Sequence, residues 1–405
     1  MEYLYKIYYK NKDQYESVYN SRIKNEVVEK ISLPYKSKDN TPTSLYFIPS
    51  IKTMNLIEQV QKNDEELINL TKDFKKNNKD HLLIKLVSDD LEASNLIEGI
   101  NSNKSELIHS TKKVLVEKNH NVKRFGKALN SYRLLLENKL DYPKTNSDIR
   151  KIYDNITAGE IDKEDSPDGK YYRKGPVYIQ KARTVSGEII HIGIEGEENI
   201  AFNIERMIDF MENSKLPSLI KIAISHYYFA YTHPFYDGNG RCGRFLSAIY
   251  LNKDYSFLTS LSLSTGSLLE KTSYYKAFEM TNKPISRGEI NFFVDTFLKI
   301  LVKGQEQIME SLYQRSLRIV ENFEKFNSII ENASEFDLAI LEIFSTNLYF
   351  TGNQPISREE IIGALEQYDY PVSRIKSRLG DFEKLDIIKI IKKRPLLYIL
   401  SEENL

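Results

Sequence analysis

A glycine-containing loop between two apolar helical segments constrains this 405-residue chain more than any other feature. The loop, residues 233–244, has the sequence HPFYDGNGRCGR, and apolar residues recur at helical spacing through residues 219–232 before it and 245–251 after it. Gly238 and Gly240 allow a turn with positive φ, so that consecutive backbone N–H groups converge at the start of the second helix. Because a helix N-terminus favours an anion, we expect a nucleotide phosphate to bind there.

The polar side chains of this loop match the needs of nucleotidyl transfer. Such a reaction requires phosphates held in place and a base that accepts the proton of the attacking hydroxyl. His233 suits the base at neutral pH, and Asp237 is a hard oxygen ligand for Mg²⁺. Asn239 and the adjoining amides would hold the α-phosphate, while Arg241 and Arg244 offer planar guanidinium groups to the β- and γ-phosphates. A plain glycine turn capped by an aspartate would leave the histidine and both arginines unexplained.

The loop resembles the signature of the Fic family of nucleotidyl transferases, His-x-Phe-x-(Asp/Glu)-Gly-Asn-Gly-Arg-x-x-Arg, and every fixed position is filled. The resemblance implies that His233 is the base, that Asp237 binds magnesium, and that the loop with its arginines binds ATP. The usual product is a protein hydroxyl that carries AMP. Relatives that phosphorylate instead tend to lack the second arginine, which is present here as Arg244, so attack at the α-phosphate is favoured. Phe235 is expected to anchor the loop in the core.

A second motif lies upstream at residues 94–99, with the sequence SNLIEG. Residues 81–97 have helical spacing, Gly99 suits a C-terminal cap, and Ser94 and Glu98 are four positions apart, so they share a helix face. Taken alone, this is an ordinary helix end. It also resembles the inhibitory helix of Fic enzymes, Ser/Thr-x-x-x-Glu-Gly/Asn. That resemblance implies that Glu98 pairs with Arg244, excludes the γ-phosphate and leaves ATP in a pose unfit for transfer.

Between the two motifs, β-rich runs at residues 170–179 and 187–193 predict a hairpin bounded by Gly and Pro. In the Fic family a hairpin flap at this place clamps the target protein by strand addition, which implies that Val177, Tyr178 and Ile179 set its register. An ordinary surface hairpin is the alternative. Further downstream, Tyr275 lies where relatives close the adenine pocket, and core packing explains this aromatic residue equally well.

Three segments are expected along the chain. Residues 1–75 form an N-terminal extension, residues 76–310 a Fic-type domain with the inhibitory helix near 81–99 and the core motif at 233–244, and residues 311–405 a connecting helix and a winged-helix-like domain. The predicted fold class is therefore mainly α, a Fic-type helical bundle with a β-hairpin flap and a C-terminal winged helix.

The C-terminal unit reads as three helices followed by a hairpin, with an apolar helical stripe formed by Val372, Ile375, Leu379, Phe382 and Leu385. Three basic residues on that helix could face DNA phosphates, but acidic residues lie on or near the same helix. The basic residues are Arg374, Lys376 and Arg378, and the acidic ones are Asp381, Glu383 and Asp386. A protein-docking or structural role is therefore favoured over DNA binding.

Charge and cysteine content narrow the function classes. Lys plus Arg and Asp plus Glu both number 57, so no net charge draws the chain to nucleic acid or to a membrane. The single cysteine, Cys242, excludes an intramolecular disulfide framework and suits a reducing cytosol. No signal-peptide pattern and no run of about eighteen apolar residues is present, so a cytoplasmic protein is expected. An effector exported by another route is the alternative.

Two functions from different classes follow. The first is a self-inhibited protein adenylyltransferase that uses ATP and Mg²⁺ to place AMP on a Ser, Thr or Tyr hydroxyl of a target protein or of itself, with reversal at the same site as an option. The second is a nucleotide-sensing, DNA-binding regulator that acts through the winged helix. The complete motif and the balanced charge favour the first. The target, the oligomeric state (a homo-oligomer included) and the signal that releases Glu98 are not determined by the sequence.

Overall fold

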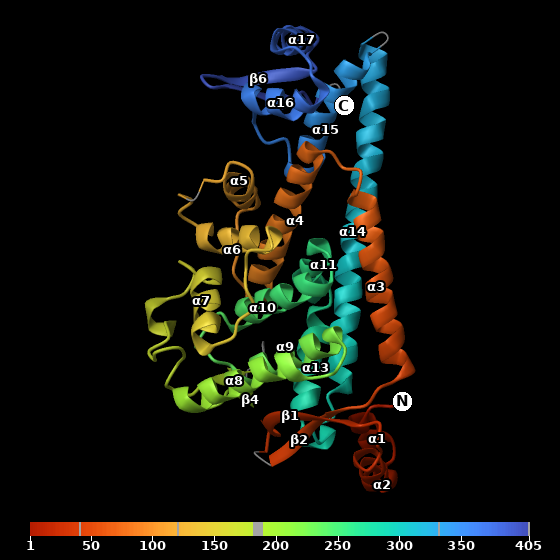
Figure 1. Ribbon diagram of the computed structural model, residues 1–405, viewed down its shortest axis with the longest axis vertical. Coiled ribbons are helices and arrows are strands. Elements are labelled where there is room, and N and C mark those ends of the chain that lie inside the picture. The colour runs from red at the N-terminus through yellow and green to blue at the C-terminus, as the bar shows by residue number, and fades with distance from the viewer. Residues whose placement is uncertain (40–41, 120, 181–188, 331–332, 404–405) are drawn as a thin grey trace. The chain divides into compact units, whose positions relative to one another are not determined.

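The computed structural model describes residues 1–39, 42–119, 121–180, 189–330 and 333–403. Over these residues the fold is mainly α-helical with small antiparallel sheets, so the predicted fold class is confirmed at this level (Figure 1). The chain divides into two compact units that are discontinuous in sequence. Unit 1 comprises Met1–Leu67, Asp90–Ser102 and Lys123–Gln307, and unit 2 comprises Ile68–Asp89, Asn103–Val122 and Ile308–Leu405.

Three long helices pass from one unit into the other along the chain, namely α3 (Ile51–Thr71), α4 (Lys76–Ile97) and α14 (Asn291–Ile329). The other elements of unit 1 are α1 (Leu4–Lys10), α2 (Lys12–Ile23), β1 (Glu29–Lys36), β2 (Pro42–Phe47), α6 (Gly126–Leu136), α7 (Asn146–Ile156), η1 (Lys163–Asp165), β3 (Tyr178–Gln180), β4 (Ile189–Ile192), α8 (Glu197–Asn213), α9 (Ser218–Thr232), α10 (Asn239–Asp254), α11 (Phe257–Ser260), α12 (Ser262–Leu269), α13 (Lys271–Asn282) and η2 (Pro284–Ser286).

The centre of unit 1 is the helix pair α9 and α10, joined by the loop at residues 233–238. Most residues of α9 are apolar and most of its side chains are buried, because neighbouring helices cover both sides of it. Helix α8 packs against α9, and α7 packs against α10. This packing holds the loop between two fixed helix ends.

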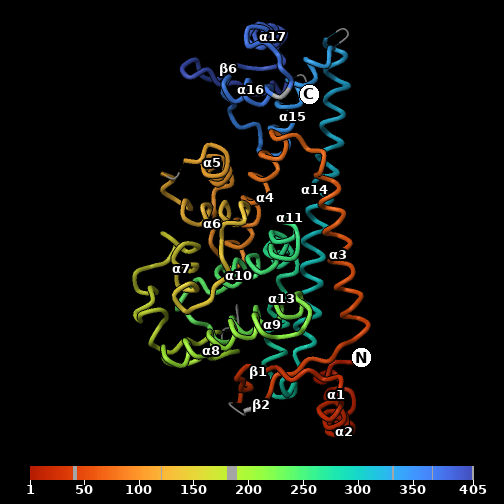
Figure 2. The backbone as a smooth tube through the Cα atoms, viewed as in Figure 1, coloured from red at the N-terminus to blue at the C-terminus, as the bar shows by residue number. Residues whose placement is uncertain are grey.

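The first residues of the chain pack on the rest of unit 1, where Figure 2 shows them in red. Strand β1 alternates exposed and buried side chains and pairs antiparallel with β2. The Tyr46 N–H donates to the Gly288 carbonyl at 2.9 Å, and the Ile290 N–H donates to the Tyr46 carbonyl at 3.0 Å. The buried Glu289 carboxylate accepts from Arg22 and from the Leu4 N–H. Backbone and side-chain contacts therefore tie this segment to the start of α14.

The predicted pairing of two strands is present, since β3 pairs antiparallel with β4, with Tyr178 opposite Ile192 and Ile179 opposite His191. The first predicted run, residues 170–179, is a strand only at its end, because the N–H groups of residues 171–173 bond the Glu197 side chain and the Pro234 carbonyl in place of a neighbouring strand. Of the second predicted run, Gly187 and Glu188 lie outside the described residues.

Unit 2 also contains α5 (Lys104–Leu115), α15 (Glu335–Thr351), β5 (Ile356–Ser357), α16 (Arg358–Leu365), η3 (Glu366–Tyr368), α17 (Val372–Lys384), β6 (Ile388–Lys393) and β7 (Leu396–Leu400). The strands form an antiparallel sheet in the order β5-β7-β6. The order of helices and hairpin is the predicted one, with β5 as an addition that two residues are too few to reveal. Its identity as a winged helix stays a prediction.

The predicted apolar stripe of α17 is only partly correct. Ile375, Leu379 and Phe382 are buried, but Val372 and Leu385 are 44% and 43% exposed, because they lie at the two ends of the helix, beyond the cluster that its middle packs against. No helix in the described part of the chain is long and apolar enough to cross a membrane.

Candidate active site

The loop between α9 and α10 is closed at its base by Asn239. The Asn239 side chain accepts from the Phe235 N–H at 2.9 Å and donates to the Phe235 carbonyl at 2.8 Å. The buried Phe235 ring stacks on Tyr153 with 3.6 Å between ring centroids, so it anchors the loop in the core. We expected Asn239 to hold a phosphate. Its amide oxygen and one of its two side-chain N–H donors are thus used by Phe235, which leaves the second N–H and the backbone N–H for a phosphate.

His233 follows the last residue of α9 in a left-handed conformation, with φ 49° and ψ 63°. Burial of the imidazole, with His191 and Arg173 nearby, lowers the pKa of His233 to about 3, so the ring is neutral at physiological pH. Its Nδ1 atom lies 3.4 Å from the Ala230 carbonyl oxygen. Because a carbonyl can only accept, Nδ1 carries the proton and Nε2 is left with a free lone pair. The ring can therefore act as a base through Nε2.

Arg241 and Arg244 lie in the first turns of α10 and are only 1% and 2% exposed. The Arg241 Nη2 atom donates to the Asp237 carboxylate at 3.2 Å. Among the described residues, Arg241 Nε and Nη1 and Arg244 Nη1 have no hydrogen-bond partner. Buried donors without an acceptor are costly, so these groups, together with the helix N-terminus that follows Gly238 (φ 79°), fit an anionic ligand.

Asp237 is the residue that would hold magnesium. Its carboxylate is 47% exposed, and the one ion pair that it makes with the described residues uses a single oxygen, Oδ2. No group of three or more His, Cys, Asp or Glu side chains in the described part of the chain could hold a metal by itself. One free carboxylate oxygen beside a phosphate site fits Mg²⁺, which takes most of its ligands from phosphates and water.

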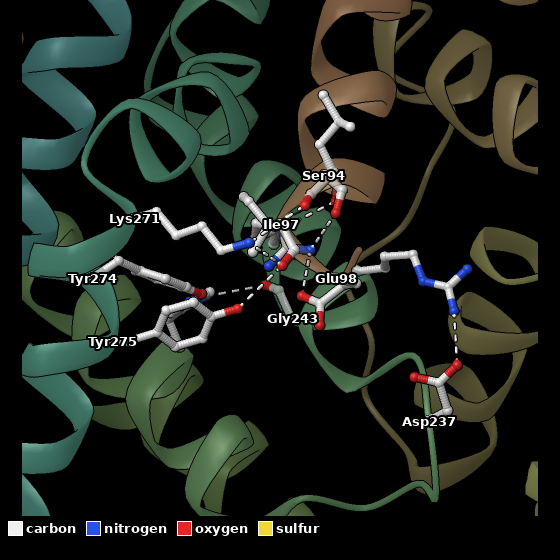
Figure 3. A network of polar contacts seen from close by, with 12 residues as sticks. Ser94, Ile97, Glu98, Asp237, Gly243, Lys271, Tyr274 and Tyr275 are labelled. Carbon is white, nitrogen blue, oxygen red and sulfur yellow. Dashed lines mark hydrogen bonds and ion pairs between the residues drawn. The ribbon is translucent and has the colours of Figure 1, made fainter. Parts of the chain in front are cut away.

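Glu98 and Ser94 both contact Arg244 from the end of α4 (Figure 3). Glu98 Oε1 lies 2.8 Å from Arg244 Nη2, and the Arg244 Nε and Nη2 atoms donate to the hydroxyl and carbonyl of Ser94 at 3.0 and 2.8 Å. The helix ends as the sequence predicted, with Gly99 at φ 81° and the Ile100 N–H bonded to the Asn95 carbonyl.

The Glu98 carboxylate also lies directly over the start of α10. A Cβ atom added to Gly240 would come within 2.0 Å of Glu98 Oε1 and 3.0 Å of Arg244 Nη1. A side-chain carboxylate thus lies close to the first turn of α10, where a helix N-terminus favours an anion. Cys242, one turn along, is buried, and its burial raises the pKa of the thiol, which leaves it unreactive.

Backbone hydrogen bonds connect the segment of the predicted flap residues Val177, Tyr178 and Ile179 to the start of this loop. The Val177 carbonyl accepts from the Gly193 N–H at 3.0 Å, and the Ile194 N–H donates to the Thr232 carbonyl at 3.1 Å. Tyr178 is 50% exposed. The flap strands are thus joined to the residue before His233.

Comparison with known proteins identifies this region. Residues 143–251, which include α7 to α10 and the whole loop, match the Fic/DOC family. These residues form a Fic/DOC domain. Members of this family generally transfer a nucleoside monophosphate to proteins.

A solved Fic family protein from Desulfovibrio desulfuricans shares the fold of this chain. It is 15% identical, with a TM-score of 0.50, over 87% of this chain and 97% of that one. Fic-1 from C. elegans is 14% identical over 65% of this chain and 73% of that chain, with a TM-score of 0.42. A Fic domain containing signaling protein from Bacteroides thetaiotaomicron is 17% identical, over 65% and 97%, with a TM-score of 0.43.

Helix α13, which follows the matched residues in the chain, holds the end of α4 (Figure 3). Lys271 Nζ donates to the Ile97 carbonyl at 2.7 Å and lies 3.4 Å from the Leu96 carbonyl. The Tyr275 hydroxyl donates to the same Ile97 carbonyl at 3.3 Å. Tyr275, predicted for the adenine pocket, therefore contacts the Glu98 segment in this structure, and its place in a nucleotide site stays a prediction.

Sequence reasoning missed Lys271, Arg173, His191 and Tyr236, which all join elements around the Fic loop. Lys271 and Arg173 donate to backbone carbonyls, and His191 contacts one. The Tyr236 hydroxyl accepts from the Gly175 N–H at 2.9 Å. Their partners are main-chain groups, which every residue has, so the sequence did not indicate these contacts.

Proposed function

We propose that this chain is a self-inhibited protein adenylyltransferase that transfers AMP from ATP to a Ser, Thr or Tyr hydroxyl of a target protein or of itself. The observation that carries the proposal is the pair of buried arginines at the start of α10, with Glu98 2.8 Å from Arg244. Three of their N–H-bearing nitrogens have no partner among the residues that the structure describes, and these groups fit phosphates. A phosphate site that holds a carboxylate of the same chain is the arrangement that self-inhibition requires. The Fic/DOC match supports the reaction class.

In the proposed reaction, His233 Nε2 takes the proton from the target hydroxyl while the hydroxyl oxygen attacks the α-phosphorus. The new bond joins that oxygen to phosphorus, the bond between the α-phosphorus and its bridging oxygen breaks, and pyrophosphate leaves. Arg241 and Arg244 stabilise the charge on the phosphates. Asp237 would hold Mg²⁺, which supplies charge neutralisation when bound. Removal of AMP from the modified hydroxyl would use the same groups.

Inhibition follows from competition for Arg244. While Glu98 occupies Nη2, the guanidinium cannot also bind the γ-phosphate there, and the carboxylate repels the triphosphate. Misplacement of reacting atoms by about 1 Å costs about a hundredfold in rate. We therefore expect low activity of the wild-type chain and a strong gain when the carboxylate is removed.

The experiment uses ATP labelled at the α- or the γ-phosphate, with the wild type, Glu98→Gly, and Glu98→Gly combined with His233→Ala. We expect α-label on protein, weak for wild type and strong for Glu98→Gly, and about a hundredfold to ten-thousandfold less after the histidine is lost. His109→Ala, at an exposed histidine, is the matched control. Label that transfers only from the γ-position would indicate a kinase, and no label from either position would contradict the transferase proposal.

A DNA-binding regulator is not favoured by the contacts of α17. Arg378 Nε donates to the Asp337 carboxylate at 2.6 Å, and the Arg374 guanidinium lies 4.4 Å from the centre of the Phe336 ring. Two of the three basic residues considered for phosphate contacts are thus engaged within unit 2. A protein-docking or structural role for this part of the chain fits these contacts better.

A further inference from the structure

Four consecutive backbone carbonyls around the candidate base are each bonded by residues of the flap. These carbonyls belong to residues 231–234. The Tyr231 oxygen lies 2.6 Å from His191 Nε2, the Thr232 oxygen accepts from the Ile194 N–H at 3.1 Å, the His233 oxygen accepts from Arg173 Nε at 2.9 Å, and the Pro234 oxygen accepts from the Arg173 N–H at 3.2 Å. The donors come from both sides of the β3–β4 pair.

Arg173 is the centre of this set. Its side chain is fully buried, and Nη1 and Nη2 donate to the Gly175 and Ile194 carbonyls at 2.5 and 2.8 Å. One guanidinium group therefore joins His233 to the chain before β3 and to the chain after β4. Every hydrogen bond of this side chain to the described residues goes to a backbone carbonyl, and burial lowers the pKa of Arg173, an effect that Tyr236 and the Glu195 carboxylate partly offset. Burying a guanidinium group that bonds only carbonyls costs desolvation free energy. A surface hairpin does not need such a contact, so the contact indicates that the geometry at this place must be held closely.

The backbone around Arg173 and His233 is also closely packed. A Cβ atom added to Gly193 would come within 2.4 Å of Arg173 Nη2 and 3.1 Å of His233 Cβ. His233 itself has a left-handed backbone at φ 49°, a conformation that persists only where its surroundings enforce it. The bonds that Arg173 makes to the carbonyls of residues 233 and 234 lie directly at that residue.

We propose that Arg173 is a positioning residue that holds His233 and the flap strands β3 and β4 as one rigid body. A target segment added to the flap would then present its hydroxyl at a fixed distance from His233 Nε2, since flap and base cannot move independently. The inference rests on the proposed transferase function and adds a residue that touches neither nucleotide nor target. Tyr236 supports the same junction, because its hydroxyl accepts from the Gly175 N–H and donates to Asp168 at 3.0 Å.

The test compares variants in the Glu98→Gly background. Arg173→Lys keeps the charge, but one ammonium group cannot reach three carbonyls that a planar fork reaches together. We expect kcat for α-label incorporation to fall about a hundredfold, while KM for ATP stays within about twofold. Lys174→Met, at the exposed neighbouring cation, is the matched control and should match the parent. Tyr236→Phe should lower kcat about fivefold, because it removes the hydrogen bonds that the Tyr236 hydroxyl makes with the Gly175 N–H and the Asp168 carboxylate but leaves those of Arg173.

A second readout does not depend on activity. Amide hydrogen exchange of residues 229–240 should become at least about tenfold faster in Arg173→Lys and stay unchanged in Lys174→Met. Unchanged kcat together with unchanged exchange would overturn the proposal, and so would a raised KM for ATP with normal kcat, which would make Arg173 a nucleotide contact. Should Arg173→Lys fail to fold, Tyr236→Phe with wild-type kcat and exchange would overturn it equally. A Glu98→Gly parent that transfers no α-label instead counts against the proposed function, and hydrogen exchange then still decides the role of Arg173.

Discussion

Replacing Lys271 by methionine should weaken the inhibited state without changing either member of the Glu98–Arg244 pair. Lys271 Nζ bonds the Ile97 carbonyl at 2.7 Å, one residue before Glu98, and the carbonyls it reaches are the terminal ones of α4. Such carbonyls have no partner within the helix, and a cation there also interacts favourably with the helix dipole. Loss of the ammonium group therefore frees the segment that carries the inhibitory carboxylate.

The magnitude follows from the contacts. A hydrogen bond from a charged donor contributes about 1.5 kcal/mol at the lower end of its range, which applies because Lys271 is half-buried. The Tyr275 hydroxyl remains on the same carbonyl and offsets part of the loss. A net loss of about 1.4 kcal/mol raises the population of the released state about tenfold. The rate of α-label incorporation should rise by that factor, and the Glu98→Gly rate is its ceiling.

The assay measures initial rates of α-label incorporation for Lys271→Met, Glu98→Gly and the double variant. Lys276→Met, at an exposed lysine of the same helix, is the control and should behave as the wild type. The double variant should be no faster than Glu98→Gly, because the lysine acts only through the inhibitory segment. An unaltered rate in Lys271→Met beside an active Glu98→Gly would refute the reasoning, as would further acceleration in the double variant.

Three further predictions concern the magnesium ligand, the stability of the fold in acid, and the close approach of Glu98 to the first turn of α10. Asp237→Ala in the Glu98→Gly background should lose magnesium-dependent transfer while ATP still binds, and a magnesium titration equal to that of the parent would make Asp237 a capping residue only. Burial lowers the pKa of His226 to about 3, below its unfolded value of about 6.5, so the unfolded chain binds a proton that the folded chain does not, and the free energy of unfolding falls as pH falls through 6.5. This residue alone should lower the free energy of unfolding by about 1.4 kcal/mol between pH 7.5 and 5.5. Urea unfolding should therefore show a steeper loss of stability in acid for the wild type than for His226→Gln. Gly240→Ala should lower the stability of the wild type more than it lowers the stability of the Glu98→Gly variant, because the added methyl group meets Glu98 Oε1 only in the wild type. Equal shifts in melting temperature in the two backgrounds would contradict the close approach.

The sequence predicted what side-chain types and helical periodicity can encode. The apolar runs on either side of the loop became α9 and α10, and Ser94 and Glu98 share one face because they are four residues apart. Their meeting with Arg244, 150 positions away from Ser94, followed only from the family resemblance, since periodicity places residues on a face but does not name the partner of that face.

Some contacts and the division into units could not be predicted from the sequence, for a physical reason. Arg173 and Lys271 bond main-chain carbonyls, which every residue carries, so no pattern of residue types marks them. The discontinuous division into two units was equally hidden, because the helical periodicity of α4 and α14 continues across the points where the chain passes from one unit to the other. The phosphate role of the Asn239 side chain stays a prediction, and the sequence did not reveal the two hydrogen bonds that this side chain makes to Phe235.

Because Glu98 and Arg244 belong to one chain, the carboxylate in the proposed inhibition acts as a ligand whose effective concentration is set by the fold that holds the end of α4. Dilution cannot dissociate it, so the inhibited fraction should be the same whether a cell holds few copies of the protein or many. An inhibitor supplied as a separate protein would instead have to be made in matching amounts. Output from this chain should therefore scale with its abundance, and only an agent that competes for Arg244 or disturbs the end of α4 should change the activity of each copy.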